Sequence, residues 1–262
     1  MHQLLLLLTL LSLVHPISGK GKGPAILPPR TQPPQLLGPP NLSQWSWIPS
    51  SPDMTDQAQH YSFGWSLGTH FSTTIQDRMS ASTYTQSMVA FFHDSPTYTQ
   101  YLHQNNVTYP MYVLELEGIA KGSKVPFETL FINQMSEEFS YFYAGKHTNI
   151  KTNSKQDDEE SSLARNPERC SDLVWISESG VPYLVHNEDS GGGDVNHTAL
   201  ISAPQGVGKN GVPFTTYTYL GNIPTGAYGW NKHDLLFTMN YVAPSNADLA
   251  GGLVSLSSTA VL

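Results

Sequence analysis

The hydrophobic pattern of this chain changes once, and the change falls at its only cysteine, Cys170. Apolar residues follow a helical period between residues 54 and 143, whereas from Cys170 onward they form short strand-like runs between turn residues. Residues 144–169 between these parts are polar and acidic, so we expect a mobile solvated loop there. The order of helices, loop and strands predicts an α+β protein, with the strand-rich part spanning 170–262.

The helical part contains a pair of glycines one turn apart. Gly64 and Gly68 lie on the same predicted helix face as Tyr61, Phe71 and Ile75. Because glycine has no side chain, this spacing lets another element approach the helix closely. Further helices are predicted over 84–103 with a break at Pro96, over 110–121, and from Pro126 onward.

The N-terminus is typical of an exported protein. Residues 4–14 are almost entirely apolar and precede Pro16 and small residues, which predicts a signal peptide over 1–19. Residues 20–53 contain nine prolines and are expected to form an extended linker without helix or sheet. Three sequons, at Asn41, Asn106 and Asn196, predict N-glycosylation. We therefore expect a secreted or lysosomal protein.

Charge and hydropathy argue against a nucleic-acid partner and against a membrane span in the mature chain. The formal net charge is −8, which does not favour nucleic acid, and after the signal peptide no apolar run is long enough to span a bilayer. A single cysteine in an exported chain cannot form an internal disulfide, so it is a buried apolar residue, an intermolecular partner or a catalyst.

The strand-rich part begins with a predicted hairpin. Strands are expected over 171–177 and 182–189, joined at Ser179-Gly180, and further strands over 198–203, 214–220 and 234–241. A two-residue loop places Glu178 opposite Val181, and this register brings Asp189 opposite Cys170. The same register directs His186 to the other face of the hairpin.

A thiol beside a carboxylate suits an N-terminal-nucleophile enzyme. Attack of Cys170 on its own Arg169–Cys170 peptide bond would free an α-amino group, which can accept the thiol proton near neutral pH. Asn240 lies in an apolar run and could donate to the oxyanion. The spacing of His186, Asp189, Asp194 and His197 matches no standard metal motif, so neither a metal nor another cofactor is expected.

Several motifs in this order resemble one known family. They are Gly64-Trp-Ser-Leu-Gly68, Leu116-Glu-Gly-Ile-Ala-Lys-Gly122, Val125-Pro-Phe-Glu128, Ile132-Asn133, Ser136-Glu137, Cys170-Ser171, His186-Asn-Glu-Asp189, Trp230-Asn231 and Asn240-Tyr241. Together they are similar to the family of acyl-coenzyme A:6-aminopenicillanate acyltransferase and N-β-alanyl-dopamine hydrolase. The resemblance covers most of 54–143 and 170–241.

That resemblance implies an αββα sandwich of the N-terminal-nucleophile hydrolases, made as a precursor that cuts itself before the cysteine. It implies Cys170 as nucleophile and base, Asp189 as supporting acid and Asn240 as oxyanion donor. His186 and Tyr241 are implied as possible substrate-binding residues. The chain departs from the family in having Arg169 rather than glycine before the nucleophile, and in stopping at Leu262, so we expect a C-terminally truncated domain.

The leading functional prediction is an amide hydrolase that acts on a small acylated amine or amino acid, with its two processed fragments remaining associated. An acyltransferase that uses the same acyl-cysteine is the first alternative, because acceptor choice depends on pocket shape. An inactive secreted glycoprotein is the second, and a papain-like protease lacks its sequence signature here.

Overall fold

The computed structural model describes residues 42–147, 170–188, 194, 196–224 and 227–240. The helices within these residues are α2 (Asp56–His70), α3 (Ser72–Ala81), α4 (Thr83–Phe92), α5 (Pro96–Thr108), α6 (Pro110–Ser123), α7 (Phe127–Gln134) and α8 (Ser136–His147). The strands are β1 (Ser43–Ser46), β2 (Ser171–Ile176), β3 (Pro182–Asn187), β4 (Thr198–Ala203), β5 (Phe214–Tyr219), β6 (Tyr228–Asn231) and β7 (Leu236–Thr238). The predicted α+β class is confirmed.

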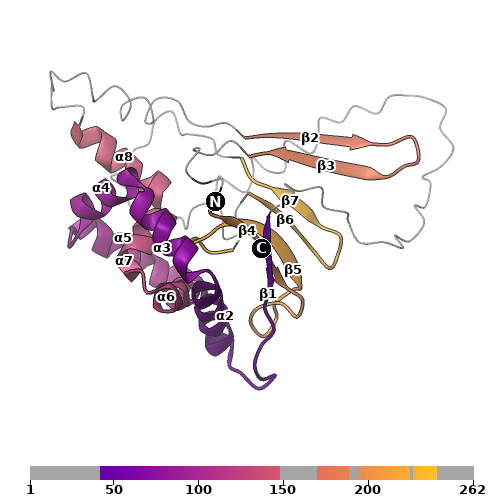
Figure 1. The fold of residues 1–262 in the computed structure, drawn as a ribbon, viewed down its shortest axis with the longest axis horizontal. Helices are drawn as coiled ribbons and strands as arrows, with labels where there is room; N and C mark the ends of the chain where they lie inside the picture. Colours follow the sequence, from indigo (N-terminus) through magenta and orange to yellow (C-terminus); the bar gives the residue numbers. More distant parts are fainter. Residues whose placement is uncertain (1–41, 148–169, 189–193, 195, 225–226, 241–262) are drawn as a thin grey trace.

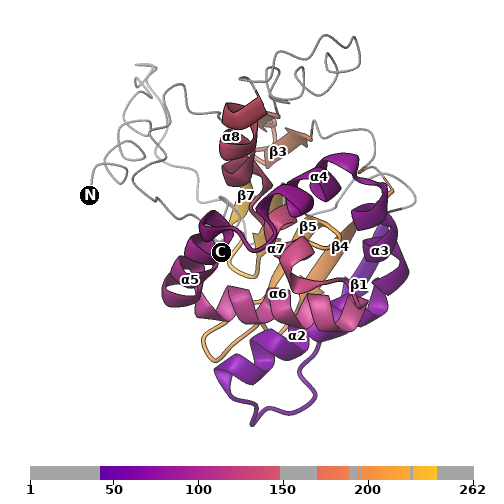
Figure 2. The ribbon, with the colours of Figure 1, turned by 90° about the vertical axis from the view of Figure 1, so that its left-hand side faces the viewer.

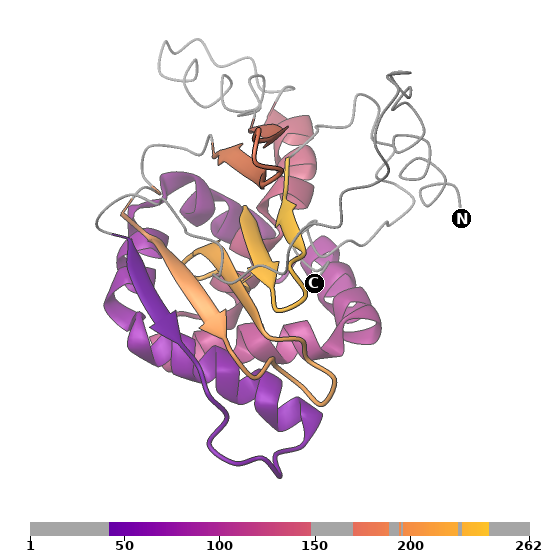
Figure 3. The same cartoon turned by 90° about the vertical axis from the view of Figure 1, so that its right-hand side faces the viewer.

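The helices form a layer against one face of a five-stranded sheet. The strand order is β1-β4-β5-β6-β7, and all neighbours except β1 and β4 are antiparallel. The helices lie in front of the strands in Figure 2 and behind them in Figure 3. Buried side chains from both layers, such as Leu67, Ile75 and Ile201, form one hydrophobic core. The β2–β3 hairpin is a separate two-stranded sheet beyond the ends of β6 and β7 (Figure 1).

The predicted linker over 20–53 is wrong in its last part, which contains β1. Ser43–Ser46 pair in parallel with Ala199–Ser202 of β4. Trp45 and Trp47 share one face of the chain and pack against Phe63, with ring centroids 6.2 and 5.3 Å away. This segment contains no proline, and burial of the Trp47 ring together with partial burial of the Trp45 ring offsets the entropy of ordering it.

Glycines let α2 and α6 approach until their backbones touch. A Cβ atom on Gly64 would lie 1.9 Å from the carbonyl oxygen of Glu115, and one on Gly118 would lie 2.3 Å from that of Tyr61. The close approach predicted for Gly64 and Gly68 is therefore confirmed. Tyr61 was expected on the packed face, but its side chain is exposed and only its backbone faces α6.

Several elements differ from expectation, and α8 extends through His147 into the predicted loop over 144–169. The first helix breaks at Phe71, where a single non-helical residue separates α2 from α3. The helix predicted from Pro126 is divided at Met135 into α7 and α8. Strand β6 was not predicted, since its four residues include Gly229 and give no clear alternation.

Among the helices of the described residues, none has both the length and the apolar character that a membrane span needs.

Replacing Gly118 by alanine should destabilise the protein. Alanine favours a helix over glycine by about 1 kcal/mol, but the new methyl group would meet the backbone of α2 and force the helices apart. We expect a net loss of about 2 kcal/mol in the free energy of unfolding, measured by chemical denaturation. Glu117→Ala, on the exposed side of the same helix, is the control and should change stability by less than about 0.5 kcal/mol.

Candidate active site

The register of the β2–β3 hairpin differs by one residue from the predicted one. Asp172 pairs with His186 and Ile176 with Pro182, which leaves a three-residue loop of Glu178, Ser179 and Gly180. The backbone N–H of Ser177 donates to Val181 (2.9 Å), and Gly180 has a left-handed φ of 80°. A three-residue loop closed by a left-handed glycine is a common hairpin form, so the predicted two-residue loop is wrong.

This shift changes which side chains lie beside the cysteine. Continuing the observed register places Glu188, rather than Asp189, opposite Cys170, and turns His186 to the same face as Cys170. The ligand atoms of Cys170, His186 and Glu188 all lie within 4.8 Å of one another. The expectation that His186 faces away from the thiol is therefore wrong.

His186 is held between two carboxylates. Its Nδ1 lies 2.8 Å from Oδ1 of Asp172, and its Nε2 lies 2.7 Å from Oε2 of Glu188. Only 3% of the histidine side chain is exposed, although both carboxylates are partly accessible. The imidazole is therefore fixed in direction, with Nδ1 toward Asp172 and Nε2 toward Glu188.

Residues of the five-stranded sheet hold the other side of this cluster. The hydroxyl of Tyr219 on β5 donates to Oε1 of Glu188, and the ring of Tyr228 on β6 lies 5.9 Å from that of His186. Tyr217 stacks on Tyr228 at 5.0 Å. Burial, aided by Tyr217 and Glu188, raises the pKa of Tyr228 to about 12, so its hydroxyl stays protonated at neutral pH.

The end of β7 contacts Asp172. Nδ2 of Asn240 donates to Oδ2 of Asp172 (2.5 Å). Burial raises the pKa of the Asp172 carboxyl, but hydrogen bonds from His186, Thr238 and Asn240, with the charge of His186, outweigh burial. The pKa therefore lies below its ordinary value, and Asp172 is ionised at neutral pH.

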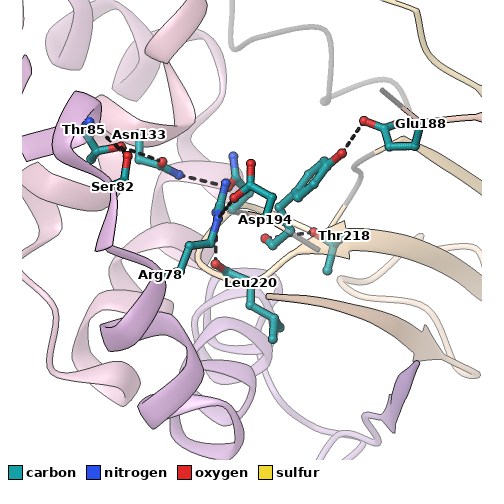
Figure 4. A network of polar contacts seen from close by, with 10 residues as sticks. Arg78, Ser82, Thr85, Asn133, Glu188, Asp194, Thr218 and Leu220 are labelled. Carbon is teal, nitrogen blue, oxygen red and sulfur yellow. Dashed lines mark hydrogen bonds and ion pairs between the residues drawn. The ribbon is translucent and has the colours of Figure 1, made fainter. Parts of the chain in front are cut away.

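A polar network behind the cluster joins the sheet to the helix layer (Figure 4). Arg78 of α3 donates to Oδ1 of Asp194 (2.7 Å) and Oδ1 of Asn222 (2.6 Å), and its guanidinium lies 5.4 Å from the Tyr219 ring centroid. Asn133 of α7 also donates to Asn222 (2.9 Å). Through Tyr219, this network positions Glu188 from the helical side.

The structure thus brings some of the predicted site residues together. Cys170 and His186 lie side by side, and Asn240 reaches them through Asp172. The side chains of Asn106 and Asn196 are exposed. Four predicted residues lie outside the described residues, namely Asn41, Arg169, Asp189 and Tyr241.

Sequence reasoning missed Asp172, Glu188 and Tyr219. The alternation of side chains along a strand could have predicted two of them, because Asp172 is two residues from Cys170 and Glu188 is two residues from His186. The signal that places these two pairs on one face is the Glu-Ser-Gly turn, whose last glycine suits the left-handed position. Tyr219 has no local signal, since it comes from another sheet.

Taken together, the cluster contains a thiol, an imidazole oriented by a carboxylate, and an amide donor. This set of groups suits nucleophilic attack by sulfur on a carbonyl carbon.

Comparison with known proteins finds similarity to a hydrolase. Over 203 residues the chain is 26% identical to the beta-alanyl-dopamine/carcinine hydrolase of Drosophila melanogaster. The chain is a distant relative of this hydrolase. The relationship confirms the family resemblance seen in the sequence motifs.

The alignment covers 73% of this chain and 49% of the fly hydrolase, so the chain spans about half the length of the curated relative it matches. No protein-family model matches the chain.

Asp172→Asn should reduce stability in a pH-dependent way. A carboxyl whose pKa is lowered on folding contributes stability above its ordinary pKa of about 4 and loses it as pH falls through the folded value. We expect the variant to be less stable than wild type by about 1–2 kcal/mol at pH 7, and the difference to shrink toward pH 3. Urea denaturation at both pH values measures the free energy of unfolding. The control is Asp53→Asn, at an exposed carboxylate, which should be as stable as wild type at both pH values.

Proposed function

We propose that this chain carries the catalytic thiol of an amide hydrolase that acts on small β-alanyl-type amines. The observation that carries the proposal is the grouping of Cys170 with His186, whose Nδ1 is in turn bonded to Asp172. The fly relative is named as a hydrolase of beta-alanyl-dopamine and carcinine, which supports the substrate class.

The chemistry follows from the groups in the cluster. The thiol proton passes to His186, and the thiolate attacks the amide carbonyl. The carbon–nitrogen bond breaks, the amine leaves with a proton, and an acyl-cysteine remains. Water then hydrolyses this thioester, releases the acid and restores the thiol. Asp172 keeps the imidazole oriented throughout.

Asn240 is the proposed oxyanion donor. One N–H of its amide donates to Asp172, and the second remains for the oxygen of the tetrahedral intermediate. Asp189 remains a predicted supporting acid.

Charge in the cluster supports a cationic acyl group. Asp172 and Glu188 place two carboxylates beside one imidazole, and a β-alanyl group carries an ammonium at neutral pH. Such a substrate would be attracted, whereas the uncharged acetyl group of N-acetyldopamine would not.

The proposal includes processing of the precursor. In the intact chain the Cys170 thiolate attacks the carbonyl of Arg169, and the N-to-S shift frees the α-amino group of Cys170. Water hydrolyses the resulting thioester and leaves a carboxylate on Arg169. The free amine then serves as a second proton acceptor, in the αββα sandwich proposed for the whole domain.

The hairpin supports that sandwich, because Leu173, Val174 and Ile176 expose more than half of their surface, as expected for a strand that packs against a further layer. Export to a secretory or lysosomal compartment is part of the same proposal, and the exposed side chains of Asn106 and Asn196 are compatible with glycans.

Cys170→Ala tests the nucleophile. The purified 262-residue chain should yield a fragment beginning at Cys170 by intact mass and N-terminal analysis, whereas the variant should remain whole. Release of β-alanine from β-alanyl-dopamine and carcinine should fall at least about a thousandfold, with N-acetyldopamine as the control substrate. Equal cleavage of the variant would show that another protease cuts the chain.

His186→Gln separates the two proton acceptors in the same assay. Cleavage of the intact chain should slow, because its α-amine is still blocked in a peptide bond. A matched control is His93→Gln, at a histidine that also contacts two carboxylates, Asp94 and Glu128, and it should process normally. Normal processing of His186→Gln would remove His186 from this role.

Asn240→Ala should lower kcat by about a hundredfold with little change in KM, because an oxyanion donor acts mainly in the transition state. Steady-state kinetics with carcinine measure both constants, and Asn231→Ala, elsewhere in the sheet, is the control. A rise in KM at unchanged kcat would indicate substrate binding instead.

A further inference from the structure

Three side chains of the site also form a set of metal ligands that the sequence spacing did not predict. The Sγ atom of Cys170, a ring nitrogen of His186 and a carboxylate oxygen of Glu188 lie within 4.8 Å of one another. Thiolate, imidazole and carboxylate are the three ligand types that zinc takes in proteins. We propose that Cys170, His186 and Glu188 bind one Zn²⁺ ion.

With no two of the ligand atoms more than 4.8 Å apart, small side-chain movements would bring them to the spacing around a tetrahedral ion. Zinc bonds of about 2.0–2.3 Å place neighbouring ligand atoms roughly 3.3–3.8 Å apart. Nε2 of His186 and Oε2 of Glu188 are now 2.7 Å apart, so they need to separate by less than about 1 Å. One ring nitrogen and one carboxylate oxygen can do this by side-chain rotation alone.

Neighbouring residues already orient two of the ligands. Asp172 accepts from Nδ1 of His186, which leaves Nε2 for the metal, as in the carboxylate–histidine–zinc arrangement. Tyr219 donates to Oε1 of Glu188, which leaves Oε2. Because both partners come from outside the three ligands, the set is prearranged before any ion binds.

Charge and ligand type select the metal. The cluster contains two carboxylates and a thiol around one imidazole, so it attracts a dication, and its sulfur and nitrogen favour zinc over magnesium or calcium. On binding, the thiol releases its proton to solvent, and Nε2 coordinates in its unprotonated form. Since the ion takes the sulfur that the proposed hydrolase needs, bound zinc should also suppress amide hydrolysis.

Zinc binding is measured without substrate, by competition between the reduced 262-residue chain and a chromophoric zinc chelator. We expect one equivalent per chain, and no competition by Mg²⁺ or Ca²⁺. Substitution with Co²⁺ should give a thiolate-to-cobalt charge-transfer band together with the visible bands of a tetrahedral ion. Absence of tight zinc binding by the wild-type chain would overturn the proposal.

Variants locate the ion. Cys170→Ser should abolish the charge-transfer band, and Cys170→Ser and Glu188→Gln should each weaken zinc binding at least about tenfold. His93→Ala removes the histidine of a surface cluster with Asp94 and Glu128 and should bind zinc like wild type. Circular dichroism without metal checks that each variant is folded. Unchanged binding by folded Cys170→Ser and Glu188→Gln would place the ion elsewhere.

The outcomes also separate this site from the proposed activity. A chain that binds zinc through these residues but hydrolyses no amide would refute only the hydrolase. A chain that hydrolyses carcinine and binds no zinc would refute only the metal site.

Discussion

The conformation of Gly180 decides which acid lies beside the sulfur. Its left-handed backbone closes a three-residue loop, and the parity of that loop sets the register of every pair in the β2–β3 hairpin. With an even loop, Cys170 would face Asp189 and His186 would point away. With the observed loop, Asp172, His186 and Glu188 share the face of Cys170. The loop at one end of the hairpin therefore determines which side chains lie beside Cys170 at the other end.

The hairpin supplies the reactive groups, but the five-stranded sheet holds them in place. Tyr219 and Asn240 come from β5 and the end of β7, and each binds a different carboxylate of the hairpin. The sheet is in turn tied to the helix layer through Arg78 and Asn133, which meet at Asn222. The helical part, where the most specific sequence motifs lie, thus contributes to the site by positioning the sheet.

The sequence predicts most of the helices and strands, but it does not predict whether the loop of the hairpin has an even or an odd number of residues. Helix starts at Pro96 and Pro110 and the close glycine contact of α2 with α6 follow from local rules, because proline and glycine restrict or free the backbone directly. The hairpin was also expected, yet its predicted loop was one residue too short, and this placed His186 on the wrong face of the hairpin. The partners Tyr219 and Arg78 depend on contacts between distant segments, which no local pattern encodes.

The contacts around His186 suit two uses that exclude each other. A hydrogen bond from Nδ1 to Asp172 fixes the ring with Nε2 toward Glu188, in the cluster that contains the thiol, and this would help both the proposed proton transfer and the proposed coordination of a metal. What separates the two uses is Glu188, since proton transfer needs no second carboxylate whereas a metal gains a ligand from it. Tyr219 holds one oxygen of Glu188 and leaves the other facing the imidazole, so the second carboxylate is a built part of the site. Glu188, which the hairpin register places opposite Cys170 instead of Asp189, is therefore the residue on which the proposed metal site and the proposed thiol nucleophile differ.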